Sequence, residues 1–277
     1  AYPISPLESL AHIGVLSTTV ADAAETLATL MGPDPRDRFS LDTAASNLEL
    51  PGNSSIQGLR VAWSPDLGYA TVDSDVLQVT TAAVLKLESL GCHVDAVVPG
   101  WEDPYQFLER IWAASHAGSH LEDLEAVRSQ LDPGRLRMVE QGMKLSAAEL
   151  AQAHFQKGPF AAAVFEFMHG YDLLVTPTLP TTAFPVGLDR PSNSVGIAAS
   201  EGILGWTPFT YPFNITGQPA ASVPAGFSES GLPVGLQIVG RWRQDSTVLN
   251  VASALEEASP WPRQAELDPS ILSPSTS

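Results

Sequence analysis

The stretch FNITGQPAASVPAGFSESGLPVGLQIVG, which spans residues 213–240, is the most informative part of this sequence. Within it, residues 221–223 and 235–239 are strand candidates, in a setting rich in glycine and proline. Residues 217–224 are mostly small residues and prolines, so the backbone there can approach its neighbours closely. We therefore expect two strands, preceded by a loop that begins near Thr207.

Upstream, residues 59–98 predict a strand, a helix and a second strand. Residues 59–63 form a short apolar run, apolar residues from Val76 to Leu90 recur at the spacing of one helix face, and residues 94–98 suit a strand. Gly91 is suited to end the helix, because a residue without a Cβ enters the left-handed conformation easily. A unit of this length most economically forms a right-handed βαβ crossover in a parallel sheet.

Another buried strand is expected at residues 173–176, because the alternating prolines and threonines that follow cannot continue as an inner strand. Thr19 and Asp22 form a capping-box pattern at the start of a predicted helix at 20–31. A last helix is predicted at 247–258, where apolar residues share one face.

The region 101–170 is predicted to be helical. Ser146 and Glu149 form a second capping box, which starts a long helix near the end of this region. We expect that helix to break at Gly158 and Pro159, because proline removes a helical hydrogen bond.

The composition indicates one globular core. The chain has 277 residues, of which 44% are hydrophobic and 16% are charged. No linker clearly divides it, so we expect a single domain over residues 1–263. Residues 264–277 are rich in serine, proline and acid, and we expect a disordered tail there.

The charge excludes two classes of partner. The formal net charge is −17, with 31 acidic against 14 basic residues, which would repel nucleic acid and an anionic membrane surface. No apolar run approaches the ~20 residues that cross a bilayer. The single cysteine, Cys92, cannot form an internal disulfide, and this indicates a reducing, cytoplasmic setting.

Three separated segments resemble the amidase signature family of amide hydrolases, in the order in which that family has them. They are TVADAA (19–24), TPTLP (176–180), and the stretch from NITGQPA (214–220) to GLPVGLQIVG (231–240). The region before TVADAA departs from the family pattern at Ala11, Val15 and Thr18. The resemblance covers nearly the whole chain and implies an α/β fold, the C-terminal part of the amidase signature fold, in which a mixed β-sheet is flanked by helices.

The resemblance also implies hydrolysis of carbon–nitrogen amide bonds by a serine nucleophile, activated through a second serine in a cis peptide and a lysine base. Such a base is needed because a free serine hydroxyl is a weak nucleophile. The lysines of this chain are Lys86, Lys144 and Lys157. None is followed by the Gly/Ser-rich run that would hold the serines, so we expect all three catalytic residues upstream of Ala1 and none in the chain.

Ser54 and Ser55 imitate a catalytic loop only faintly, since their place before a predicted strand matches a connector of the family. The leading interpretation is therefore the C-terminal portion of an amidase-type hydrolase, whose partner is the missing N-terminal part of the same fold. The alternative is a non-catalytic binding or subunit protein derived from that fold. A homo-oligomer is compatible with either interpretation.

A third, weaker interpretation is a metal hydrolase that uses His116 and His120, which lie four residues apart on a predicted helix. The spacing lacks the glutamate of an HExxH motif, so no metal site is predicted. No GxSxG, GxGxxG or P-loop pattern occurs, and no cofactor is implied.

By resemblance, the TPTLP loop and the loop before NITG face the substrate channel. The predicted substrate-binding residues, for a small-molecule amide, are Thr178, Trp206, Thr207 and Phe209. Some relatives carry an acidic residue near Trp206 and Thr207, and its absence here indicates a less polar, aromatic-lined pocket. The alternative for Trp206 and Phe209 is core packing. Asn214 is predicted to hold the turn ahead of Gly217.

Overall fold

The computed structural model describes residues 7, 10–37, 39–41, 48–49, 51–52, 54–188, 190–191 and 204–262. Within these residues the centre is a five-stranded mixed sheet in the order β2-β1-β3-β5-β4. The strands are β1 (Arg60–Trp63), β2 (His93–Ala96), β3 (Leu173–Pro177), β4 (Ala220–Phe227) and β5 (Pro233–Gly240). β1 is parallel to β2 and β3, whereas β5 is antiparallel to β3 and β4. The predicted tail, 264–277, lies outside the described residues.

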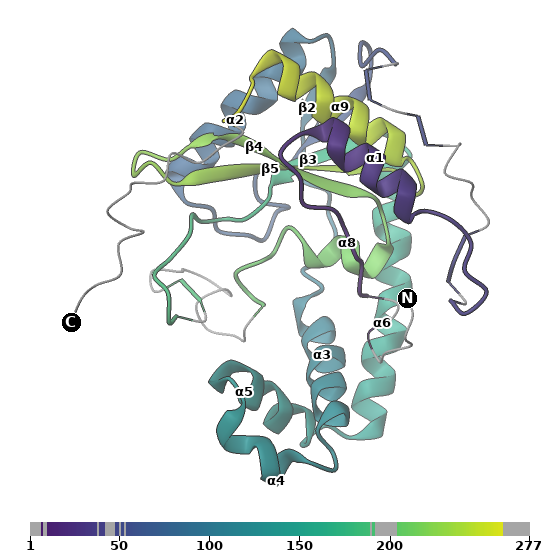
Figure 1. Ribbon diagram of the computed structural model, residues 1–277, viewed down its shortest axis with the longest axis vertical. Helices are drawn as coiled ribbons and strands as arrows, with labels where there is room; N and C mark the ends of the chain where they lie inside the picture. The colour runs from purple at the N-terminus through teal and green to yellow at the C-terminus, as the bar shows by residue number, and fades with distance from the viewer. Residues whose placement is uncertain are drawn as a thin grey trace.

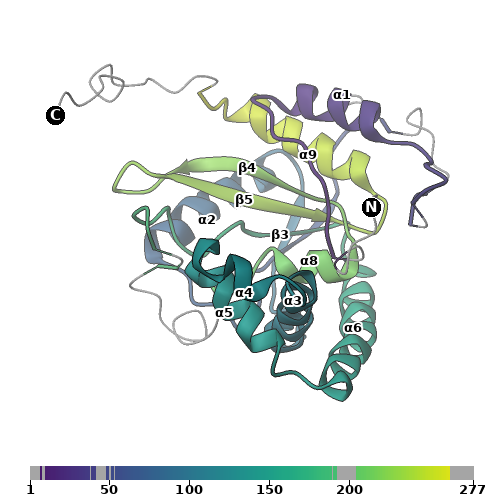
Figure 2. The same ribbon diagram turned by 60° about the horizontal axis from the view of Figure 1, so that its bottom comes forward.

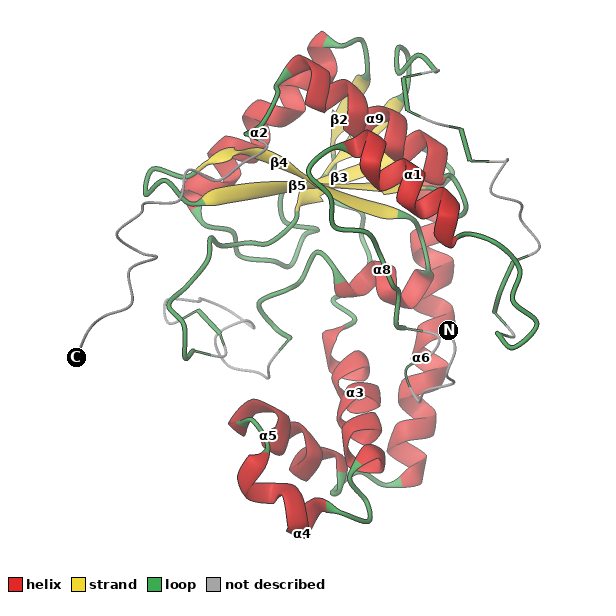
Figure 3. Ribbon diagram, viewed as in Figure 1, coloured by secondary structure: helices red, strands yellow, loops and turns green. Residues whose placement is uncertain are grey.

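Helices cover both faces of the sheet (Figures 1 and 2). One face carries α1 (Val20–Leu30), α2 (Ser74–Ser89) and α9 (Asp245–Ala258). The other carries α3 (Tyr105–Ser119), α6 (Ala147–Met168) and the short α8 (Tyr211–Thr216). In Figure 3, α3 and α6 continue beyond the sheet to a helical lobe with α4 (Leu124–Val127) and α5 (Pro133–Gly142).

Alternation along the strands produces the two apolar layers, because successive side chains of a strand point to opposite faces. Val61 and Trp63 pack with α1, α2 and α9, while Ala62 between them packs with α3, α6 and α8. Leu174 faces the same side as Ala62, and its neighbours along β3 face the other side. A parallel sheet covered on both faces needs such continuous apolar runs.

The predicted βαβ unit is confirmed. β1 and β2 pair in parallel, and α2 connects them with Gly91 in the left-handed region, at φ 95°. The predicted capping box at Ser146 and Glu149 has both of its hydrogen bonds, whereas at Thr19 only the bond to the cap side chain is present. The Asp22 N–H donates to Thr19 Oγ1 at 3.1 Å, and the Glu149 N–H donates to Ser146 Oγ at 3.2 Å.

The predicted break at Gly158 and Pro159 is wrong, because α6 runs without interruption through both residues. Proline at position 159 leaves the carbonyl of Phe155 without its helical donor. Phe155 is 80% exposed and Pro159 is exposed too, so that carbonyl lies on the side where water can bind it. The buried side chains lie on the opposite face of α6, where packing holds the helix together; they are Ala153, Phe160, Val164 and Met168.

α8 lies where we predicted only a loop. Its signals are present in the sequence, since Pro212 occupies the first turn and Gly217 follows the last residue in the left-handed region, at φ 72°. The strands at 221–223 and 235–239 are confirmed but longer than predicted. β4 accommodates Pro224 because the opposite side of β4 has no neighbouring strand in the described sheet.

Candidate functional site at the carboxyl end of strand β3

Polar side chains form a row across the sheet where β1 and β3 end. Thr176 pairs in register with Gln237 on β5, and Gln237 pairs with Ser222 on β4. Ser64, directly after β1, is fully buried, and its Oγ has no hydrogen-bond partner in the described part of the chain. Open α/β sheets bind ligands beyond the carboxyl ends of their parallel strands. This row is therefore a candidate site.

A pair of hydroxyl groups stands at the rim of this row. Thr178 Oγ1 and Ser222 Oγ are 2.7 Å apart, although β5 lies between their strands. Gly235 of β5 makes this contact possible, because a Cβ on that residue would lie 2.8 Å from Thr178 Oγ1 and 2.9 Å from Ser222 Oγ. Ser222 and Thr178 are both partly accessible to solvent, so both hydroxyls lie near the surface.

The loop that follows Thr178 is held at two points. The Thr178 N–H donates to the carbonyl of Gly235 at 2.9 Å, which extends the pairing of β3 with β5 by one residue. The Asp73 N–H, just before α2, donates to the carbonyl of Pro180 at 2.8 Å. The predicted TPTLP loop thus has a fixed course at the end of β3.

The second predicted loop, residues 204–210, lies against the first. The ring of Trp206 contacts the ring of Phe184 edge to face, with centroids 5.1 Å apart. Thr207 is half-buried, and its Oγ1 donates to the carbonyl of Leu204 at 2.8 Å. Phe209 is fully buried among the core residues on the α8 side of the sheet. Trp206 thus joins the loop that begins at Thr178 through a ring contact, and Phe209 lies beneath the surface.

Two tyrosine hydroxyls form hydrogen bonds near residues 204–210, and one of them bonds to that segment directly. Tyr69 Oη donates to the carbonyl of Pro208 at 3.3 Å, and Tyr211 Oη donates to Asp103 Oδ1 at 2.7 Å. Burial, and then the negative charge of Asp103, raise the pKa of both tyrosines. Both therefore remain protonated hydrogen-bond donors at neutral pH.

The other residues that the sequence singled out have structural partners. Asn214 Nδ2 donates to the carbonyl of Leu10 at 2.8 Å, so it fixes the N-terminal segment against α8. Both ring nitrogens of His120 are engaged, Nδ1 with Asp123 at 3.0 Å and Nε2 with Arg135 at 3.1 Å. The pKa of His116 is lowered, mainly because its ring is partly buried. No group of three metal-ligating side chains forms among the described residues.

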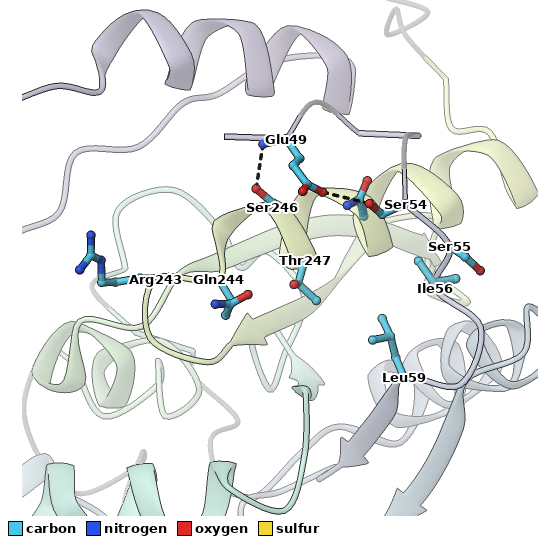
Figure 4. A pocket seen from close by; sticks show the side chains of 10 residues that line it. Glu49, Ser54, Ser55, Ile56, Leu59, Arg243, Gln244, Ser246 and Thr247 are labelled. Atoms are coloured by element: carbon cyan, nitrogen blue, oxygen red, sulfur yellow. Dashed lines mark hydrogen bonds between the residues drawn. The ribbon is translucent and has the colours of Figure 1, made fainter. Parts of the chain in front are cut away.

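A separate pocket of about 300 Å³ lies on the opposite face of the sheet, at the start of α9 (Figure 4). Ser54 Oγ donates to Glu49 Oε2 at 2.9 Å, and the Glu49 N–H donates to Ser246 Oγ at 3.0 Å. Ser55 Oγ accepts from the N–H of Gln57 at 3.2 Å. The bond from Glu49 to Ser246 ties the connector ahead of β1 to α9, and none of the four predicted substrate-binding residues lines this pocket.

Three members of the row were missed from the sequence: Ser64, Ser222 and Gln237. A polar residue inside an otherwise apolar strand, as in LQIV at 236–239, is the signal that could have found Gln237.

In the part of the chain that the structure describes, no helix is both long and apolar enough to span a membrane.

The chain matches the family described as Amidase over residues 6–249. Acylamidase from Rhodococcus erythropolis is 35% identical over 264 residues, which cover 95% of this chain and 55% of that protein. A glutamyl-tRNA(Gln) amidotransferase subunit from Synechococcus sp. (strain CC9902) is 30% identical over 278 residues, which cover 91% of this chain and 55% of that protein. The chain therefore spans about half the length of the curated relatives it matches.

Solved structures show the same fold. A bacterial aryl acylamidase of the amidase signature family superposes with a TM-score of 0.75 at 26% identity, over 88% of this chain and 52% of that one. The 6-aminohexanoate cyclic dimer hydrolase, complexed with substrate, superposes with a TM-score of 0.80 at 25% identity, over 94% of this chain and 58% of that one. The expected mixed α/β fold and the resemblance to this family are confirmed.

Proposed function

Because the chain belongs to the amidase family, we propose that it forms part of a hydrolase that cleaves carbon–nitrogen amide bonds in small molecules. The observation that carries this proposal is the family match over residues 6–249, together with 35% identity to an acylamidase. The position of the polar row supports it, because the row lies at the carboxyl ends of the parallel strands, where α/β folds bind ligands.

We assign to this chain one wall of the substrate site. Thr178 and Thr207 supply hydroxyl groups that can hydrogen-bond a polar amide, and Ser222 adds a third beside Thr178. Trp206, whose ring contacts that of Phe184, supplies an apolar surface for the acyl or aryl part of the substrate. Phe209 supports this wall from the core. An amide with an aromatic substituent suits such a wall better than a small polar amide.

The nucleophile and its base belong, in this proposal, to a segment upstream of Ala1. The match accounts for 55% of the acylamidase, so that relative contains residues with no counterpart in this chain. The hydroxyls of Ser54 and Ser55 bond to Glu49 and to the backbone of Gln57, in the connector ahead of β1. A cytoplasmic location is proposed from the single cysteine alone.

The test compares two proteins: this chain, and this chain extended by the coding sequence upstream of Ala1. Both are assayed for release of aniline from acetanilide and of ammonia from acetamide. We expect hydrolysis by the extended protein only, and faster with acetanilide. Hydrolysis by neither protein would favour the alternative, a non-catalytic subunit of the same fold, and hydrolysis by the short chain would place the nucleophile within it.

A further inference from the structure

We propose that Gln237 is a positioning residue, which holds residues 204–210 at a fixed distance from Thr178 and so sets the width of the substrate site. The role in the substrate site rests on the proposed function, whereas the role in holding residues 204–210 rests on geometry alone. Gln237 lies in the middle of β5, between Leu236 and Ile238, whose side chains point into the opposite apolar layer.

The side chain of Gln237 is 4% exposed, so its amide is buried beside an apolar layer. A buried amide destabilises the fold unless hydrogen bonds replace the water it loses. Both hydrogens of Nε2 have acceptors here. One bonds to Thr176 Oγ1 at 3.1 Å, and the other bonds to the carbonyl of Phe209 at 2.7 Å.

These two bonds connect three parts of the chain that are far apart in sequence. Thr176 is 61 residues before Gln237, and Phe209 is 28 residues before it. Thr178 directly follows β3 and continues its pairing with β5, so its side chain lies on the same side of the sheet as that of Thr176, two residues earlier. One side chain therefore fixes the backbone of Phe209 relative to β3, the strand that leads directly into Thr178.

The other hydrogen bonds of residues 204–210 are mostly local. Thr207 bonds to Leu204 through its N–H and its Oγ1, and Thr210 bonds to Thr207 in the same two ways. These bonds shape the segment but do not locate it on the sheet. Tyr69 contacts the carbonyl of Pro208 at 3.3 Å, a longer distance than the 2.7 Å bond from Gln237. Gln237 is thus the short link between this segment and the sheet.

Two variants test this role in the isolated chain. Gln237→Met removes both donors at nearly constant volume, and Thr176→Val removes one of the two acceptors at constant shape. We expect hydrogen–deuterium exchange at the amides of Thr207 and Thr210 to become at least about tenfold faster in Gln237→Met. Thr176→Val should give a smaller increase, because the bond to Phe209 remains.

The matched control is Gln218→Met, which removes another buried glutamine. Gln218 is 6% exposed, and its Nε2 donates to the carbonyl of Gly240 at 3.0 Å, at the far end of β5. This control should accelerate exchange near Gly217 and Gly240 and leave residues 204–210 at the rate of the parent chain. Equal exchange of residues 204–210 in Gln237→Met and in the parent chain, or the same increase in both Met variants, would overturn the proposal.

The substrate part is tested separately, in the extended protein that hydrolyses acetanilide. We expect Gln237→Met to raise KM about tenfold and to change kcat much less. A displaced wall weakens binding of the substrate and of the transition state to a similar extent. A fall in kcat with KM unchanged would refute the role in the substrate site. If the extended protein hydrolyses no amide, the proposed function fails, while the exchange measurement still decides whether Gln237 positions the segment.

Discussion

Thr178 directly follows β3 and Ser222 lies on β4, two strands that do not pair with each other, yet their hydroxyl oxygens are 2.7 Å apart. β5 separates the two strands, and Gly235 on β5 leaves the space in which the hydroxyls meet. The two residues are 44 positions apart in sequence, and neither lies in a local motif that predicts the other. The rim of the candidate site thus depends on a residue that contributes no side chain to it.

Gly235→Ala should therefore separate this pair. The new Cβ would lie within 3 Å of both hydroxyl oxygens, so at least one side chain must leave its present rotamer. We expect a loss of about 1–3 kcal/mol in the free energy of unfolding, measured with urea. Adding Ser222→Ala to Gly235→Ala should recover part of the loss, because it removes one of the two contacts. An unchanged unfolding midpoint in Gly235→Ala would contradict the close approach.

Gly142→Ala should disrupt the helical lobe. Gly142 ends α5 where it packs on α3, and the backbone carbonyl of Ala113 occupies the space that a Cβ would need. A backbone atom cannot move aside as a flexible side chain can, so we expect a loss of about 3 kcal/mol. The measurement is urea unfolding followed by far-UV circular dichroism.

Gly118→Ala is the control for that variant. Gly118 lies in α3, and among the described residues no neighbouring atom comes within 4 Å of the position that a Cβ would take. Alanine has a higher helix propensity than glycine, so Gly118→Ala should raise the free energy of unfolding by about 0.5–1 kcal/mol. Losses of similar size in both variants would show that the α3–α5 contact is not the cause.

The capping box of α6 predicts a specific pH dependence. The backbone N–H of Ser146, and then its hydroxyl, hold the pKa of Glu149 below its usual range. A depressed pKa contributes stability above the unfolded value of about 4.3, and this contribution is lost as the pH falls through the folded value. Glu149→Gln should therefore be less stable than the parent chain at pH 7, and the difference should shrink below about pH 4. A difference that is constant between neutral and acidic pH would exclude this explanation.

Trp206→Ala should impair an aromatic substrate selectively. In the extended protein we expect KM for acetanilide to rise about tenfold, because the substrate loses an apolar surface, while KM for acetamide changes little. Trp242→Ala is the control, since that ring is 53% exposed and follows β5 at its far end. Equal effects of Trp206→Ala on both substrates would refute the wall that we assign to Trp206 and Phe184.

Local patterns predicted much of the fold. The βαβ unit and the caps at Thr19 and Ser146 depend on residues within one element or one turn, so their spacing was visible in the sequence. The break predicted at Pro159 failed for the opposite reason. Burial of Phe160 and Val164 on one face, with Phe155 and Pro159 exposed on the other, decided the outcome, and a single-residue propensity contains neither fact.

The sequence by itself determined that the chain would form alternating strands and helices with an apolar layer on each face, because hydrophobic periodicity fixes which side of an element is buried. Only the tertiary structure decided which polar side chains meet. Strand order placed Ser222 beside Thr178, and register placed Gln237 opposite Thr176 and within reach of Phe209. Strand order and register arise from packing between elements distant along the chain, and one sequence contains no local signal for such distances.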